Sequence, residues 1–314
     1  MLQESPAPLI LRQQPGLGGP IFALMASVLT LSGCDARSRS APVSEPVSEL
    51  MGETVNEPTN EPGSGPMGAA DPSADPSADR ARYPASPIPE KSRQMIVGIT
   101  ESWSATDAEL RMYRRAAGGE WQASTAPWSA TVGRTGVAWG RGLHGHAGPE
   151  GQPGPVKREG DGKAPAGLFA LLRVYGYHRD TSTEMDFTPV TDSYRCVNDS
   201  ASAHYNKIVD KERIAEPDWR SAEIMRRRDE RYRLVIEVGH NDPAAGVVAE
   251  GGSCIFLHLW GRPGEATAGC TAMDGDHMAQ LLAILEPSAQ PVYVLLPRDR
   301  YQELAPRWGL PPAW

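Results

Sequence analysis

The stretch Gly-Ser-Cys-Ile-Phe-Leu-His-Leu-Trp-Gly-Arg-Pro-Gly-Glu-Ala-Thr-Ala-Gly-Cys-Thr-Ala-Met, residues 252–273, decides how the rest of the chain is arranged. Its first part is apolar and predicts a β-strand over 253–260 that carries His258. A turn with the sequence Arg-Pro-Gly follows at 262–264, and small residues then surround Cys270. The turn can bring the histidine and the cysteine together from two different segments.

The spacing of His258 and Cys270 fits a thiol–imidazole catalytic pair, because a nucleophilic cysteine needs a base within about 3 Å. Cys254 shares the strand face of His258 but lies about 13 Å away at the usual strand rise, so Cys270 is the better partner. Ala268 and Gly269 leave backbone N–H groups accessible to a developing oxyanion, and we assign that role to Gly269. A buried structural histidine beside a buried free cysteine is the alternative.

An apolar run at 21–31 has the length of a secretory signal and is too short to span a bilayer as a mature helix. It ends in Leu-Ser-Gly-Cys, which resembles the bacterial lipobox. We therefore expect a lipoprotein signal peptide over 1–33 and lipidation of Cys34. The expected location is the periplasmic side of the cell envelope, with a lipid anchor in a membrane. A buried apolar helix, with Cys34 as a bystander, is the alternative.

Residues 34–91 are rich in Pro, Ser and Glu and show neither helical nor strand periodicity. Such a segment cannot bury enough apolar surface to offset its conformational entropy, so we predict a disordered tether. Ten acidic and five basic residues between 35 and 91 account for −5 of the formal net charge of −8. The remaining chain is not basic, and no nucleic-acid partner is expected.

Residues 92–314 alternate apolar and polar positions between glycine-rich turns, which predicts one strand-rich domain of normal size. The expected fold class is mainly β, or α+β. Strands are predicted at 94–100, 109–115, 232–238, 253–260 and 291–296. Helices are predicted at 219–231 and after Asp274, which suits an N-cap.

Cysteine arithmetic predicts one disulfide. If Cys34 is acylated, three of the four cysteines remain, and an odd number in an oxidising compartment suggests one pair and one free thiol. We expect a bridge between Cys196 and Cys254, which leaves Cys270 free. The His-Gly-His sequence at 144–146 lacks the further ligands of a metal site, so neither a metal nor a cofactor is expected.

Three stretches together resemble the L,D-transpeptidase (YkuD-type) family of cell-wall enzymes. The family's histidine followed by Ser/Thr-x-Gly-Cys is matched by His258 and residues 267–270. Its Gly-Ser-x-Ile-Phe-x-His strand is matched at 252–258, and its Lys-x-Glu-Gly-Asp-x-x-x-Pro-x-Gly segment at 157–167. The resemblance extends over 92–314 and implies a β-sandwich-like catalytic domain.

The resemblance also implies acyl transfer on peptidoglycan stem peptides. Cys270 would attack the carbonyl that precedes the terminal D-Ala of a tetrapeptide stem, release D-Ala and form a thioester. His258 would be the general base and acid, and an amine would accept the acyl group. Thr267, Arg262 and Lys157 become candidate substrate-binding residues.

Two departures from the family pattern keep other functions open. The family often has histidine where this chain has Ala268, and often an arginine or asparagine within the segment matched by 271–273. One alternative is an L,D-carboxypeptidase, or a hydrolase that trims stems or releases a wall-linked lipoprotein. The other is a non-catalytic lipoprotein that binds the cell wall.

Overall fold

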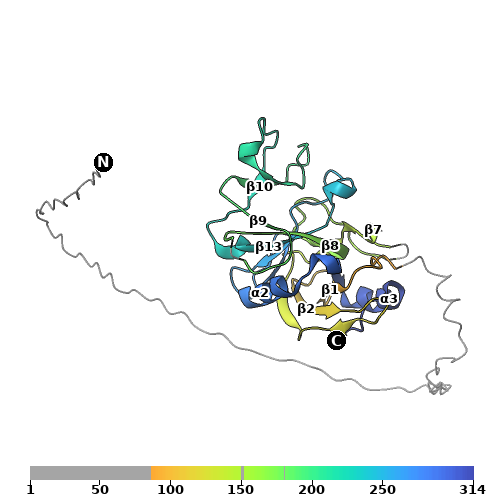
Figure 1. Cartoon of the computed structure of the whole chain (residues 1–314). Coiled ribbons are helices and arrows are strands. Elements are labelled where there is room, and N and C mark those ends of the chain that lie inside the picture. The colour runs from red at the N-terminus through yellow and green to blue at the C-terminus, as the bar shows by residue number, and fades with distance from the viewer. Residues whose placement is uncertain (1–85, 150–151, 180) are drawn as a thin grey trace, which may run out of the picture. The chain divides into compact units, whose positions relative to one another are not determined.

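The computed structural model describes residues 86–149, 152–179 and 181–314 (Figure 1). The predicted signal peptide, Cys34 and most of the predicted tether lie outside the described residues. Within the described residues, no helix is long and apolar enough to cross a membrane. The folded part begins before residue 92, because Ile88 is buried and the Ser86 hydroxyl donates to the backbone oxygen of Trp308 at 2.5 Å.

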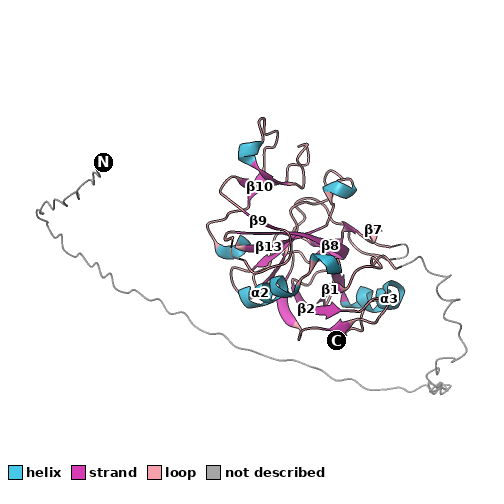
Figure 2. Ribbon diagram, in the orientation of Figure 1, coloured by secondary structure: helices cyan, strands magenta, loops and turns pink. Residues whose placement is uncertain are grey.

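The described chain is mainly strand, as the sequence predicts (Figure 2). The strands are β1 (Gln94–Thr100), β2 (Asp107–Arg114), β3 (Gln122–Ala123), β4 (Trp128–Thr131), β5 (Val137–Trp139), β6 (Arg141–Gly142), β7 (Gly145–His146), β8 (Ala164–Gly176), β9 (Phe187–Pro189), β10 (Tyr194–Val197), β11 (Ile208–Asp210), β12 (Ala222–Ile224), β13 (Leu234–Val238), β14 (Phe256–Leu259), β15 (Thr271–Met273) and β16 (Val292–Pro297). The helices are α2 (Gly275–Ile284) and α3 (Arg298–Trp308), with 3₁₀ turns η1 (Lys211–Arg213), η2 (Glu230–Tyr232), η3 (Pro243–Ala245) and η4 (Pro287–Ala289).

The main sheet closes on itself. Its strands follow the order β1-β16-β8-β13-β14-β15-β4-β2-β3, and β1 also pairs antiparallel with β2. This second pairing joins the ends of the sheet into a barrel, which removes exposed strand edges. The mainly β class is therefore confirmed, with a barrel in place of two separate sandwich sheets.

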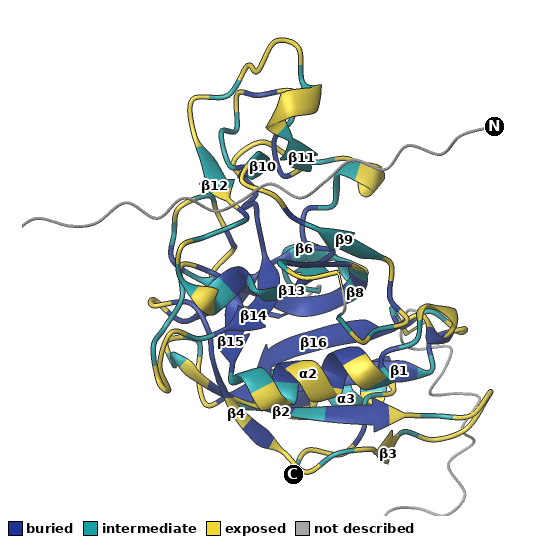
Figure 3. Ribbon diagram, turned by 60° about the vertical axis from the view of Figure 1, so that its left-hand side comes forward, coloured by how far each residue is buried: buried dark blue, intermediate teal, exposed yellow. Residues whose placement is uncertain are grey.

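The core lies between the barrel strands and the two helices. β1 and β16 are buried at every position and pair in parallel, as expected for near-continuous apolar runs. α3 contacts both strands, and α2 follows β15 and contacts β14 (Figure 3). The carboxylate of Asp274 accepts the N–H groups of Asp276 and His277, so the predicted N-cap is confirmed.

The helix predicted over 219–231 is wrong. Ala222 to Ile224 form β12, which pairs antiparallel with β10, and a 3₁₀ turn follows. Because the apolar residues of this segment are few, period two and period 3.6 fit it almost equally well, and pairing with β10 decides the outcome. β11, β10 and β12 make a separate small sheet, which extends away from the barrel (Figure 3).

The strand predicted over 253–260 is shorter than expected, and one helix was not predicted. β14 covers Phe256–Leu259 only, because Cys254 adopts a left-handed backbone conformation with φ +56°. α3 buries Tyr301, Leu304 and Trp308 along one face despite the proline inside it.

His144 is a half-buried residue that packs against aromatic side chains. Its ring lies edge-on to Phe169, with centroids 5.6 Å apart, and over Gly167, where a Cβ would lie 2.0 Å from the His144 Cε1 atom. Burial lowers the pKa of His144 to about 4, partly offset by hydrogen bonds to the backbone of Leu168 and Gly140. The side chain is therefore neutral at physiological pH.

Two neighbouring leucines test this description of the core. Leu168 is fully buried and Leu143, whose N–H donates to the Leu168 carbonyl, is 41% exposed. We expect Leu168→Ala to lower the free energy of unfolding by about 2–5 kcal/mol, because it opens a cavity in the barrel. Leu143→Ala should change it by about 0.5 kcal/mol or less. Urea denaturation with the disulfide kept oxidised measures both, and equal losses would contradict this packing.

Candidate active site

β14 and β15 place the two predicted catalytic residues on one wall. They pair in parallel, with His258 opposite Ala272, and Cys270 immediately precedes β15. Side chains alternate along a strand, so Cys270 faces the same side as Ala272 and His258. The strand spacing and rise put the Cα atoms of His258 and Cys270 about 8 Å apart, within reach of the two side chains. Both residues line a pocket of about 460 Å³.

The segment between β14 and β15 is fastened to the end of β4. The N–H of Thr267 donates to the Val132 carbonyl at 2.9 Å, and the N–H of Arg134 donates to the Thr267 carbonyl at 2.8 Å. The Thr131 hydroxyl donates to the Glu265 carbonyl at 2.8 Å. These bonds fix the approach to Cys270 through backbone contacts.

Thr267 organises the turn before the cysteine. Its hydroxyl donates to the Cys270 carbonyl at 2.6 Å and accepts the N–H of Gly269 at 3.0 Å. Thr267 lines the pocket as predicted, but the N–H of Gly269 donates to Thr267 and is not free for an oxyanion in this structure. The N–H of Cys270 itself has no acceptor among the described residues and is the better candidate donor.

His258 is held as a neutral base. Its Nδ1 atom lies 2.7 Å from the Leu259 carbonyl oxygen, which assigns the proton to Nδ1 and leaves the lone pair on Nε2. Burial lowers the pKa of His258 to about 4. The Leu259 carbonyl opposes this shift, and the guanidinium groups of Arg227 and Arg231 add to it.

Cys270 is a buried, protonated thiol. Burial raises its pKa, and the nearby carboxylate of Glu223 raises it further. The N–H of Phe256, the ammonium of Lys157 and the hydroxyl of Tyr232 act in the opposite direction. The thiol donates to the Cys254 carbonyl at 3.4 Å. The site therefore holds a thiol that needs a base to become a nucleophile, and no standing thiolate.

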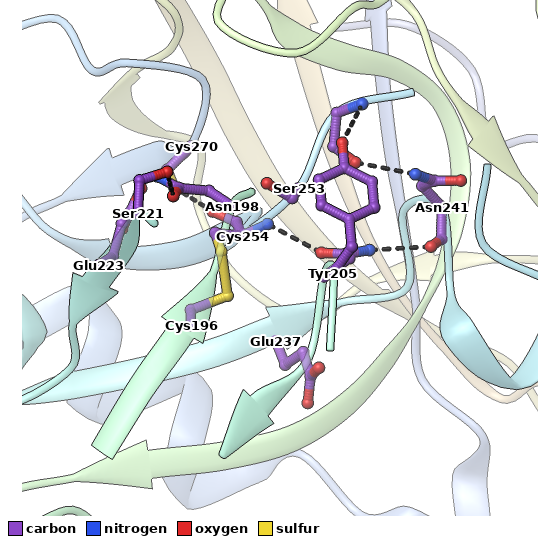
Figure 4. Close-up of a disulfide and its surroundings, with 12 residues drawn as sticks. Cys196, Asn198, Tyr205, Ser221, Glu223, Glu237, Asn241, Ser253, Cys254 and Cys270 are labelled. Atoms are coloured by element: carbon purple, nitrogen blue, oxygen red, sulfur yellow. Dashed lines mark hydrogen bonds between the residues drawn. A yellow bond between two sulfur atoms is a disulfide. The ribbon is translucent and has the colours of Figure 1, made fainter. Parts of the chain in front are cut away.

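The disulfide forms between the pair expected from the cysteine count together with the assignment of Cys270 as the partner of His258. Cys196 and Cys254 are bonded, with Cα atoms 6.0 Å apart, and Cys270 is free (Figure 4). The regular strand rise used to separate Cys254 from His258 does not apply at Cys254, because β14 begins only at Phe256 and Cys254 has a left-handed backbone. The disulfide is what removes Cys254 as a nucleophile. Asn206 supports the break, since its Oδ1 atom accepts the Cys254 N–H at 2.8 Å.

The segment 157–167 also reaches the pocket. Lys157 is buried, and its ammonium contacts the Asp161 carboxylate and the Arg158 carbonyl, each at 2.7 Å. Glu159 accepts the hydroxyl of Ser253 at 2.7 Å. Lys157 lines the pocket as predicted, but its charge is paired within its own loop.

The predicted contact of Arg262 is not supported, because this residue is exposed and does not line the pocket. Three other arginines do. Arg227 pairs with Asp229 at 2.9 Å through two nitrogens, and Arg231 pairs with Glu265 at 2.8 Å. The guanidinium of Arg134 has no hydrogen bond or ion pair to any described side chain.

Sequence reasoning missed Arg134, Glu223 and Tyr232. None belongs to a recognisable motif, and each reaches the pocket from a segment whose position depends on long-range pairing. No three His, Cys, Asp or Glu side chains among the described residues are grouped to hold a metal ion.

Comparisons with known proteins leave the family unassigned. No family model and no curated protein matches the chain. The structure of Bdellovibrio bacteriovorus Bd1075 aligns with a TM-score of 0.33 and 14% sequence identity. The alignment covers 68% of this chain and 50% of that chain, so this chain spans about half of its length. A similarity at this level supports no conclusion about fold or function.

The protonation state of the pair predicts a pH profile for alkylation. Because the thiol pKa is raised, we expect the rate of iodoacetamide labelling at Cys270 to keep rising with pH, with a midpoint above the ordinary thiol value of about 8.5. Peptide mass spectrometry measures labelling at Cys270 alone. A plateau already reached near pH 6–7 would show a standing thiolate–imidazolium pair and contradict this description.

Proposed function

We propose that the protein is a cysteine-dependent acyltransferase of peptidoglycan stem peptides, an L,D-transpeptidase. One observation carries the proposal. Residues from the three resembling stretches, far apart in the chain, line one pocket: Lys157 and Glu159, then Ser253 and His258, then Thr267 to Cys270. That pocket contains a free thiol just before β15 and a neutral imidazole on the adjacent strand β14.

The chemistry follows from the positions of the two groups. The Cys270 thiol turns from the Cys254 carbonyl and gives its proton to His258 Nε2, and the sulfur attacks the stem carbonyl. The Cys270 N–H donates to the oxyanion. Collapse breaks the peptide bond, D-Ala leaves with the proton from His258, and a thioester remains. An acceptor amine then attacks the thioester carbonyl and gives its proton to His258. The carbon–sulfur bond breaks, and the Cys270 sulfur leaves and takes the proton back from His258.

Arg134 is the residue we assign to a substrate carboxylate. Its guanidinium is the cation at the pocket that no described side chain neutralises, whereas Arg227, Arg231 and Lys157 are each paired with a carboxylate. A guanidinium suits a carboxylate because it can donate two parallel hydrogen bonds.

Hydrolysis is the second candidate. Ala268 and Ala272 both line the pocket, and their methyl groups leave space beside Cys270 for water as the acceptor. Mass spectrometry of digested muropeptides separates the two reactions, since transfer gives crosslinked dimers and hydrolysis gives trimmed monomers.

The proposed location agrees with the proposed substrate. A lipid anchor at Cys34 and a tether would hold the domain at the membrane surface, on the side where peptidoglycan lies. Cys34 and most of the predicted tether lie outside the described residues.

Carbapenem acylation tests the roles of the two catalytic residues. We expect the wild type to gain the mass of one carbapenem at Cys270 and Cys270→Ala to gain none. His258→Gln should slow acylation about 10²–10⁴-fold, because it removes the base. The exposed His146 provides the matched control, and His146→Gln should behave as wild type. Acylation of Cys270→Ala at the wild-type rate would exclude the proposed nucleophile.

Two arginines test the proposed carboxylate contact. We expect Arg134→Gln to lower kcat/KM for D-Ala release from a tetrapeptide stem about tenfold or more, because the substrate carboxylate loses its charge-assisted hydrogen bonds. Arg262→Gln, which also removes one positive charge, should change it less than about twofold, because Arg262 is exposed outside the pocket. D-Ala release is followed with a coupled oxidase assay. Equal effects of the two substitutions would refute the assignment.

A further inference from the structure

Glu223 reaches the nucleophile's pocket from the small three-stranded sheet. The pairing of β10 with β12 puts Glu223 opposite Cys196, and the disulfide ties Cys196 to Cys254 (Figure 4). The carbonyl of Cys254 accepts the Cys270 thiol proton. Glu223 therefore lines the same pocket as Cys270, held there by one disulfide and one strand pairing.

Tyr232 connects Glu223 to both proposed catalytic residues. Its hydroxyl donates to Glu223 Oε2 at 2.7 Å, and its ring lies edge-on to the His258 ring, with centroids 5.1 Å apart. Tyr232 and Cys270 also belong to one buried cluster and line the same pocket, and the Tyr232 hydroxyl lowers the pKa of Cys270, against the effect of burial. A phenol has one proton, so Tyr232 donates either to the carboxylate or to the sulfur, and not to both.

We propose that Glu223 is a positioning residue that decides, through Tyr232, whether the Tyr232 hydroxyl stabilises the Cys270 thiolate. The proposal rests on the proposed role of Cys270 as nucleophile. When Glu223 is ionised, the hydroxyl donates to it and turns its lone pairs toward the sulfur. When Glu223 is protonated, its carboxyl donates to the Tyr232 oxygen, and the hydroxyl donates to the sulfur. In both cases the thiol proton passes to His258 Nε2. We call the chain from Glu223 through Tyr232 to Cys270 the relay; it changes only the direction of hydrogen bonds.

The surroundings of Glu223 make it easier to protonate than an exposed carboxylate, although in the structure it accepts the Tyr232 hydroxyl, as the ionised form does. Burial raises its pKa, the Glu159 carboxylate adds to this shift, and the Tyr232 hydroxyl and the Arg227 guanidinium oppose it. A thiolate at Cys270 brings a second negative charge close to Glu223, so loss of the thiol proton strengthens the tendency of Glu223 to keep its own. The protonated acid and the thiolate therefore stabilise each other through Tyr232.

A double-mutant cycle on the full chain tests the relay. The Gln amide can donate to the Tyr232 oxygen as a protonated carboxyl would, and it lacks the negative charge that holds the hydroxyl, so Glu223→Gln favours the thiolate-stabilising arrangement. We expect it to lower the apparent pKa of Cys270 alkylation by about one unit, which raises the labelling rate below that pKa about tenfold. In the Tyr232→Phe background, where no hydroxyl remains, Glu223→Gln should give much less of this gain.

The same cycle identifies the result that overturns the proposal. An equal gain in both backgrounds would show that removal of charge alone acts on the thiol. No gain from Glu223→Gln in the wild-type background would also overturn it. Glu212→Gln, which removes an exposed charge next to β11, is the matched control and should give the wild-type profile.

A second measurement applies if Tyr232→Phe fails to fold. In protein labelled at the tyrosine Cζ carbon, the Tyr232 signal should titrate with Glu223 in the wild type and lose that titration in Glu223→Gln. A signal that ignores pH in the wild type would overturn the relay. Neither measurement uses peptidoglycan, so absence of D-Ala release would refute the proposed function without deciding the relay.

Discussion

The parallel pairing of β14 with β15 is the constraint on which the site depends. Parallel neighbours cannot be joined by a tight hairpin, so the chain must leave β14, cross over and return in the same direction. Here residues 260–270 make that crossover, and backbone hydrogen bonds to the end of β4 fasten it. The result puts Cys270 at the entry to one strand and His258 within the other, on the same face.

Burial determines the protonation states of His258 and Cys270. The same desolvation that lowers the pKa of His258 raises that of Cys270, so neutral imidazole and neutral thiol coexist. The disulfide between Cys196 and Cys254 then adds the outer wall, because it fixes the small sheet that delivers Glu223. The buried thiol is unreactive until hydrogen bonds within the pocket stabilise its thiolate. This agrees with the proposed nucleophile, which would react only when a substrate carbonyl is bound.

The sequence predicts features that depend on neighbouring residues, such as a strand, and features that depend on composition, such as the number of disulfides. Residues 94–100 form the predicted strand because their apolar run has no competing pattern. The cysteine count predicts one disulfide, and the assignment of Cys270 as the free thiol identifies its two cysteines. The failures are long-range. Nothing in the apolar run around Cys254 signals a left-handed residue, which Asn206 stabilises from another segment. Glu223 shows no motif, because only its pairing partner places it at the pocket.

Direct mass measurement of a covalent intermediate tests the central claim that Cys270 and His258 perform acyl transfer in this pocket. The protein is mixed with a tetrapeptide stem, quenched in acid and digested for peptide mass spectrometry. The account predicts a hydroxylamine-sensitive adduct on Cys270 with the mass of the stem without D-Ala, lost in His258→Gln at the same quench time. D-Ala release with the acyl group on another residue would contradict it. Undiminished D-Ala release without an adduct on Cys270 would contradict it as well.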